Sequence, residues 1–165
     1  MVGYHRNGFH LDGDEADDVG NGMALELAAG SRHVMLFLRG DAADTSPESG
    51  PRYDSGHADF GVRLFLLPPG MAVRPYADAA VTYADVSFFD PETDDIGRTL
   101  TGGGWSYAGG VVLGGANVGL DLSYRTTAVH FDEMEVDGET ALLPEPFRGR
   151  TTRVVVGLRI SRVYR

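Results

Sequence analysis

Apolar and polar residues alternate along much of the chain with a period of two. Residues 118–125 show this without interruption: apolar Val118, Leu120, Leu122 and Tyr124 alternate with Gly119, Asp121, Ser123 and Arg125. A period of two is typical of a β-strand that presents one apolar face. The same pattern predicts eight strands, over residues 2–11, 22–28, 33–40, 57–66, 73–89, 105–113, 117–131 and 151–164.

The connections between the predicted strands alternate in length. Three are short, at residues 29–32, 67–72 and 114–117. Four are long, at residues 12–21, 41–56, 90–104 and 132–150. Successive connections of an up-and-down meander lie at opposite ends of the sheet, so this order gathers every long connection at one end. Such asymmetry is typical of outer-membrane barrels.

These two patterns define the predicted fold. The length of 165 residues fits a single domain over residues 1–165. We predict an all-β protein, an eight-stranded antiparallel up-and-down transmembrane β-barrel with short periplasmic turns and long external loops. Two segments fit less well, because residues 34–40 are apolar on both faces and residues 73–86 offer little more than alanine to lipid.

The polar faces of the strands mix small residues with charged ones. Eight strands enclose a lumen just wide enough to be filled by side chains, and charges placed there must pair to offset their desolvation. We therefore predict an inward ionic network that leaves no open pore. Its members are Glu26, Asp59, Asp78 and Asp121 with Arg39, Arg63, Arg125, Arg153 and Arg159.

The apolar faces of the strands then meet lipid. Aromatic residues near strand ends are candidates for the membrane interface, and these are Tyr83, Trp105, Tyr107 and Tyr124. In an alternative interpretation, the same aromatics belong to the core of a soluble eight-stranded calycin-like barrel. That barrel would bind a small apolar ligand in its interior.

Charge and composition narrow the function classes. The chain carries 24 acidic residues and 14 arginines, contains no lysine and has a formal net charge of -10. A surface that follows nucleic-acid phosphates needs a basic excess, so we expect no nucleic-acid partner. Of the acidic residues, 19 fall in the four long connections, which predicts acidic external loops. The absence of cysteine excludes disulfides and cysteine-ligated metals.

Other candidate chemistry is sparse. The acidic stretch at residues 12–18 departs from the EF-hand register, since Asp17 and Met23 stand where a glycine and a glutamate are required. The histidines lack HxxxH and HExxH spacing, so we expect neither a metal nor a cofactor. Ser87 and His130 near the external rim leave a second alternative, a lipid-modifying enzyme. Their spacing matches no catalytic motif, and we expect no enzymatic activity.

Three segments resemble the small outer-membrane β-barrel family of Gram-negative bacteria, with its porin-like or OmpA-type transmembrane domain. Residues 3–30 combine a first strand, an acidic Gly-Asp loop and a Gly-x-Gly entry to the next strand, and residues 57–86 and 103–129 are similar to later hairpins. The resemblance implies an outer-membrane location and insertion by the barrel-assembly machinery. We expect a structural or surface-interaction role, with outer-membrane lipid, lipopolysaccharide and other surface or envelope proteins as partners.

Targeting segments add little to this picture. No run of about 18 apolar residues is present, so we expect no transmembrane helix. Residues 1–15 lack the apolar h-region of a signal peptide. If the protein is exported, we therefore expect this sequence to be its mature part.

Overall fold

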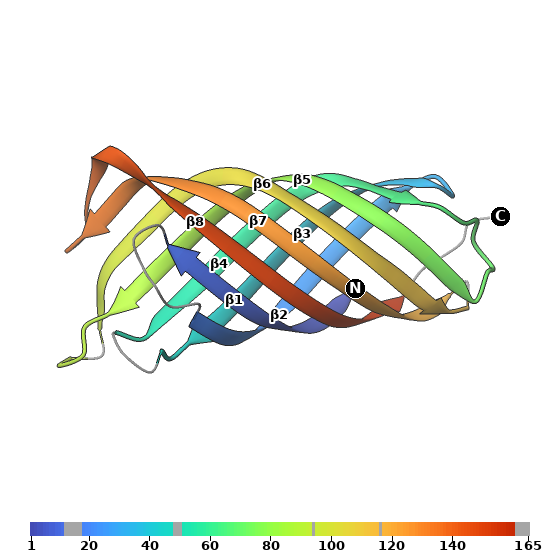
Figure 1. Cartoon of the computed structure of the whole chain (residues 1–165), viewed down its shortest axis with the longest axis horizontal. Coiled ribbons are helices and arrows are strands. Elements are labelled where there is room, and N and C mark those ends of the chain that lie inside the picture. Colours follow the sequence, from blue (N-terminus) through green and yellow to red (C-terminus); the bar gives the residue numbers. More distant parts are fainter. Residues whose placement is uncertain (12–17, 48–50, 94, 116, 161–165) are drawn as a thin grey trace.

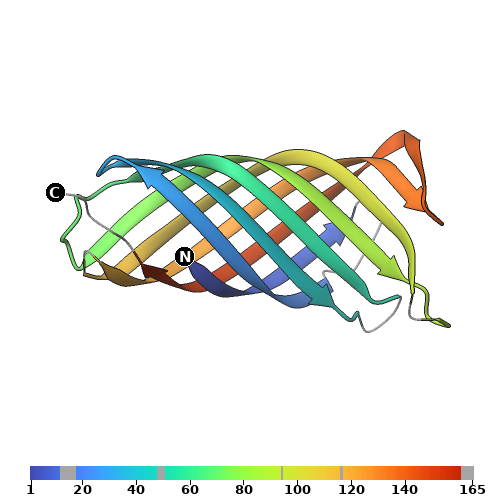
Figure 2. The same cartoon turned by 180° about the vertical axis from the view of Figure 1, so that it is seen from behind.

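The computed structural model is a closed barrel of eight antiparallel strands (Figure 1 and Figure 2). It describes residues 1–11, 18–47, 51–93, 95–115 and 117–160. Each strand pairs with its neighbours in sequence, and β1 closes the ring against β8. The strands are β1 (Val2–Leu11), β2 (Asp18–Gly30), β3 (Val34–Thr45), β4 (Tyr53–Phe65), β5 (Val73–Phe89), β6 (Ile96–Gly114), β7 (Val118–Val136) and β8 (Glu139–Ile160). The predicted eight-stranded up-and-down barrel is confirmed.

The two ends of the barrel are named by the strands that finish there. At the turn end β2, β4, β6 and β8 finish, and at the outer end β1, β3, β5 and β7 finish. Within the described residues, no helix is long and apolar enough to cross a bilayer. Most of the acidic stretch at residues 12–18 and the predicted strand end at 161–164 lie outside the described residues.

Side chains alternate between the lumen and the exterior along each strand. On β8, Arg153 and Val155 are buried, whereas Val154 and Val156 are 55% and 45% exposed. Large apolar side chains are exposed on all eight strands, and most of the buried polar side chains are charged or hydroxylated. The exterior of this barrel is therefore apolar and its lumen polar, which is the reverse of a soluble barrel.

The segment at residues 34–40 has apolar residues on both faces because an aromatic ring is part of the ionic lumen. Met35 and Phe37 face inward, while Leu36 and Leu38 face outward. The ring of Phe37 lies 5.4 Å from the guanidinium carbon of Arg63 and equally far from that of Arg125. Cation–π contacts of this kind suit an aromatic ring among buried arginines.

Apolar side chains close the lumen toward both ends. The cluster toward the outer end consists of Phe9, Tyr53, Ala84, Val86, Leu100, Val129 and Phe131. A smaller cluster toward the turn end consists of Phe65, Tyr76 and Val112, with Met35 packed against it. Most of the buried charges lie between the two clusters. They are thus separated from bulk water at either end.

The strands at the outer end are longer than the sequence pattern predicts. β3 continues to Thr45, β6 begins at Ile96, and most of residues 132–150 is paired strand. The β7–β8 connection is reduced to Asp137 and Gly138, and this hairpin projects at the left of Figure 1. Apolar alternation fades over residues 132–148 because neither face is buried there, and it fades at the end of β3 because the inward residues are Asp41, Ala43 and Thr45. Backbone pairing does not require apolar alternation.

The turn between β7 and β8 allows a stability prediction. Asp137 and Gly138 have φ of 53° and 81°, as a type I′ Asp-Gly turn requires. We expect Gly138→Ala to destabilise the hairpin by about 1 kcal/mol, because alanine is strained at positive φ even in open space. Gly109→Ala has equally open space without positive φ, so we expect no loss. Amide exchange at Val136 and Glu139 measures the difference, and equal exchange in both variants would contradict it.

Candidate functional site: a charged lumen inside an apolar exterior

Arg63 of β4 lies at the centre of the charged lumen. Its guanidinium donates to both carboxylate oxygens of Glu26 on β2, at 2.8 and 2.9 Å. It also donates to both oxygens of Asp78 on β5, at 2.8 Å each. Arg63 and Asp78 are direct cross-strand partners, so the register brings them to the same face. Such bidentate pairs are strong charge-assisted hydrogen bonds, and this one is fully buried.

Arg125 of β7 connects one further carboxylate, that of Asp59, to this centre. It lies 2.8 Å from an oxygen of Asp78 and 3.2 Å from an oxygen of Asp59. Asp59 also accepts hydrogen bonds from the hydroxyls of Thr82 at 2.5 Å and Ser106 at 3.0 Å. Several donors thus offset the cost of burying one carboxylate.

Asp121 and Arg159 extend the network toward the turn end. Asp121 accepts a hydrogen bond from the Tyr76 hydroxyl at 2.6 Å and lies 3.7 Å from Nη1 of Arg63. The guanidinium of Arg159 lies over the ring of Phe65, 5.0 Å from its centroid. Arg159 therefore contacts the apolar cluster at the turn end, whereas Asp121 joins that cluster to the central pairs.

Asp41 of β3 belongs to the same network, although the sequence pattern placed it in a connection. It accepts hydrogen bonds from Arg153 of β8 and from Nε of Arg39, the latter at 3.2 Å. Among the described residues, the buried carboxylates are then Glu26, Asp41, Asp59, Asp78 and Asp121, and the buried guanidiniums are Arg39, Arg63, Arg125, Arg153 and Arg159. The two sets are equal, so the buried network has no net charge.

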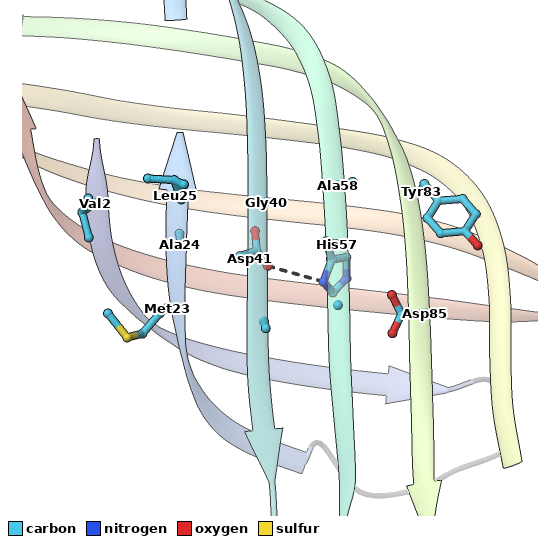
Figure 3. A pocket seen from close by; sticks show the side chains of 12 residues that line it. Val2, Met23, Ala24, Leu25, Gly40, Asp41, His57, Ala58, Tyr83 and Asp85 are labelled. Atoms are coloured by element: carbon cyan, nitrogen blue, oxygen red, sulfur yellow. Dashed lines mark ion pairs between the residues drawn. The ribbon is translucent and has the colours of Figure 1, made fainter. Parts of the chain in front are cut away.

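Two histidines that the sequence reasoning did not place in the lumen lie beside Asp41. Nδ1 of His57 is 3.4 Å and Nε2 of His5 is 3.9 Å from Oδ1 of Asp41, and Figure 3 shows the Asp41–His57 pair on neighbouring strands. His57 is the cross-strand partner of Asp41, so extending the alternation of β3 would have found both. Over the described ranges, no group of three or more His, Asp and Glu side chains could hold a metal.

The exterior near this pair is hollowed. A depression of about 650 Å³ is lined by small residues, including Gly40, Ala42 and Ala58, and bordered by Met23 and Tyr83 (Figure 3). All five are on the outward side of the wall, by the alternation of β2 to β5. The depression therefore lies mainly on the apolar exterior, where it would receive lipid chains in a membrane.

Comparison with known proteins identifies the fold. No family model matches the chain, and no curated protein sequence matches it. The structure is similar to that of Neisserial surface protein A, with a TM-score of 0.69 and 14% identity over 96% of this chain and 94% of that one. It is also similar to Ail, the attachment invasion locus protein of Yersinia pestis, with a TM-score of 0.53 and 12% identity over 95% and 93% of the two chains. The chain has the fold of the small outer-membrane β-barrels.

The four aromatics predicted for the membrane interface all point outward from this outer-membrane-type barrel. Tyr83, Trp105, Tyr107 and Tyr124 are 54% to 60% exposed, on β5, β6 and β7. Tyr83 is the last aromatic before the outward-facing Asp85, and Trp105 pairs with Val81 on the same face. Tyr107 and Tyr124 lie nearer the turn end, within the apolar band. Tyr4 of β1 is a further outward aromatic that the sequence reasoning omitted.

Ser87 and His130 do not form a pair in this outer-membrane-type barrel. The Ser87 hydroxyl is hydrogen-bonded to that of Thr99 at 3.0 Å. Thr99 is in turn the cross-strand partner of Glu135 on β7. His130 instead pairs in register with Gly103 and lies two strands from Ser87. The two residues are therefore not placed for the shared proton transfer that a Ser-His nucleophile needs.

Proposed function

We propose that this protein is an outer-membrane β-barrel of a Gram-negative bacterium, closed to solutes and acting through its outer end in a structural or surface-interaction role. The observation that carries the proposal is the inversion of the barrel. Exposed Leu, Val, Tyr and Trp side chains surround a lumen of buried ion pairs, and hydrocarbon is the solvent that favours this arrangement. Insertion by the barrel-assembly machinery and contact with lipopolysaccharide belong to the same proposal.

The lumen argues against the two alternatives. A soluble calycin-like barrel that holds an apolar ligand needs an apolar interior, but Arg63 and its carboxylate partners occupy the centre. A lipid-modifying enzyme needs a nucleophile and a base in contact, and Ser87 and His130 lie apart. Monodisperse behaviour in plain buffer without detergent would overturn the membrane proposal. We expect instead a folded barrel only in detergent or lipid, with a gel mobility that changes on heating.

The closed lumen yields a second measurable outcome. Ion pairs fill its centre, and the clusters around Phe131 and Phe65 cover them toward the two ends. In planar bilayers we therefore expect no stepwise conductance from the folded protein. Steady single-channel currents, with the heat-modifiable barrel as the only species, would show an open path and contradict the closed-barrel role.

The projecting β7–β8 hairpin is the surface best suited to a partner. Its acidic side chains are exposed, namely Asp132, Glu133, Glu135, Asp137, Glu139 and Glu145. Leu142 is 76% exposed beside them. Negative charge around an exposed apolar residue fits a cationic partner. One structure of Ail is a complex with the heparin analogue sucrose octasulfate, whereas this hairpin has the opposite preference.

The hairpin proposal is tested with a cationic probe. Replacing Glu133, Glu135 and Glu139 with glutamine is expected to weaken binding of polylysine to the refolded barrel severalfold, most strongly at low salt. The three substitutions leave the lumen charges, Asp78 among them, unchanged, so heat modifiability should match that of the wild type. Undiminished polylysine binding would remove the hairpin as the contact surface.

A further inference from the structure

Basic side chains gather on the exterior of β7, β8 and β1, which lie side by side in Figure 1. Four of them occupy outward positions at the outer end and are named the basic face: His10, His130, Arg148 and Arg150. Arg6 also points outward on β1, but it pairs with Val154 and lies nearer the turn end. The register pairs His10 with Arg150 and His130 with Arg148. Cross-strand partners lie within about 5 Å at Cβ, so these side chains form one patch.

The basic face lies directly beyond apolar positions on the same strands. Along the outward side of β8, Leu158, Val156 and Val154 are followed by Thr152 and then by Arg150. This order matches a lipid, whose acyl chains lie toward the turn end and whose charged headgroup lies toward the outer end. In this arrangement Arg148 and Arg150 lie at the level of the headgroup, below the tip of the β7–β8 hairpin.

A hollow at the same place offers room for a headgroup. It has a volume of about 430 Å³ and is lined by Gly8, His10, Val19, Arg150 and Thr152. A Cβ at Gly8 would lie 3.0 Å from Oγ1 of Thr152, so glycine keeps the groove between β1 and β8 open. Arg148 and Arg150 are exposed, and within the described part of the chain no carboxylate lies within ion-pair distance of either.

The opposite side of the barrel carries the opposite charge at its outer end. Asp44, Asp54 and Asp85 face outward on β3, β4 and β5, and Asp44 pairs in register with Asp54. Arg52 lies 3.2 Å from Asp44 and is its ion-pair partner. Among the described outward positions just above the apolar band, basic side chains therefore stand on β7, β8 and β1 and carboxylates on β3, β4 and β5. The exposed acidic residues of the β7–β8 hairpin begin at Asp132, beyond the basic face.

We propose that the basic face binds the phosphate of a membrane-lipid headgroup, with the acyl chains of that lipid along the apolar positions below it. The guanidinium groups of Arg148 and Arg150 match phosphate oxygens in a bidentate geometry. The apolar positions directly below favour a lipid over a soluble polyanion, because only a lipid covers both. This inference rests on the proposed membrane location and adds one defined lipid site on one side of the barrel.

The test uses the whole barrel in phosphatidylcholine nanodiscs that contain a small fraction of lipid A, either phosphorylated or dephosphorylated. Native mass spectrometry after release into neutral detergent counts the lipid A that stays bound. We expect the wild type to retain the phosphorylated form preferentially. Arg148→Gln with Arg150→Gln should lower its retention about 30-fold, at about fivefold for each arginine near a lipid surface. Lysine at both positions keeps the charge but not the bidentate geometry, so retention by that variant should lie between those of the wild type and the glutamine variant.

The control variant Arg52→Gln removes an exposed arginine from the acidic side and should leave retention unchanged. Equal retention of both lipid A forms by the wild-type barrel would overturn the lipid site while leaving the membrane location intact. Failure of the wild type to enter nanodiscs would overturn both. If the glutamine variant loses binding of sucrose octasulfate but keeps lipid A, the basic face binds a soluble polyanion and the lipid proposal is wrong.

Discussion

Replacing Arg63 with methionine is expected to lower the free energy of unfolding by about 3 to 5 kcal/mol, the usual cost of removing one partner from a buried ion pair. The substitution keeps an unbranched chain but removes four hydrogen bonds to Glu26 and Asp78. Both carboxylates would then be buried with too few cations. Urea titration of the barrel in lipid vesicles measures the loss, with fluorescence of Trp105, the single tryptophan, as the signal.

The matched control is Arg52→Met, which breaks an ion pair of similar length at the surface. Arg52 lies 3.2 Å from Asp44, but both side chains are about half exposed. Exposed pairs contribute at most about 1 kcal/mol, so its titration should stay close to the wild type. Adding Glu26→Gln to Arg63→Met should recover part of the loss, because one unpaired charge is removed with its partner. Equal costs for Arg63→Met and Arg52→Met would show that the lumen pairs do not stabilise the barrel.

The strand number, topology and inward charges follow from the sequence because a period of two determines which side of a sheet each residue occupies. The structure places all nine charged residues derived from that alternation in the lumen. Contacts between them follow partly from register as well. Glu26 and Arg39 are cross-strand partners whose charged groups lie 4.0 Å apart, and Arg63 and Asp78 are cross-strand partners as well. Which arginine lies at the centre depends on the relative stagger of all eight strands. The alternation within a single strand does not determine that stagger.

Asp41 and the β7–β8 hairpin lie beyond the reach of the apolar pattern. The residues after position 40 are small or acidic, yet Phe37, Arg39 and Asp41 share one parity. The predicted network also held one arginine more than its carboxylates, and Asp41 supplies the missing charge. The dipeptide Asp137-Gly138 is itself an Asp-Gly hairpin signal, and it identifies this turn although apolar alternation is not sustained over residues 132–150.

Leu38→Arg is expected to destabilise the barrel in lipid by about 2 to 4 kcal/mol, as an arginine does at the midplane of a bilayer. Leu38 points outward from β3 and is flanked across the strands by Leu27 and Phe60. In a soluble barrel, the same change would replace an exposed leucine by a well-solvated arginine at little cost. The size of the loss therefore distinguishes a lipid environment from water.

The matched variant for this test is Val34→Arg on the same strand and the same outward face, but close to the turn end. The cost of an arginine falls to about 0 to 1 kcal/mol near the membrane interface, so Val34→Arg should be much milder than Leu38→Arg. Urea titration in phosphatidylcholine vesicles measures both. Depth dependence along one strand is a property of a bilayer and of no aqueous surface, so equal and small losses would place the exterior of this barrel in water.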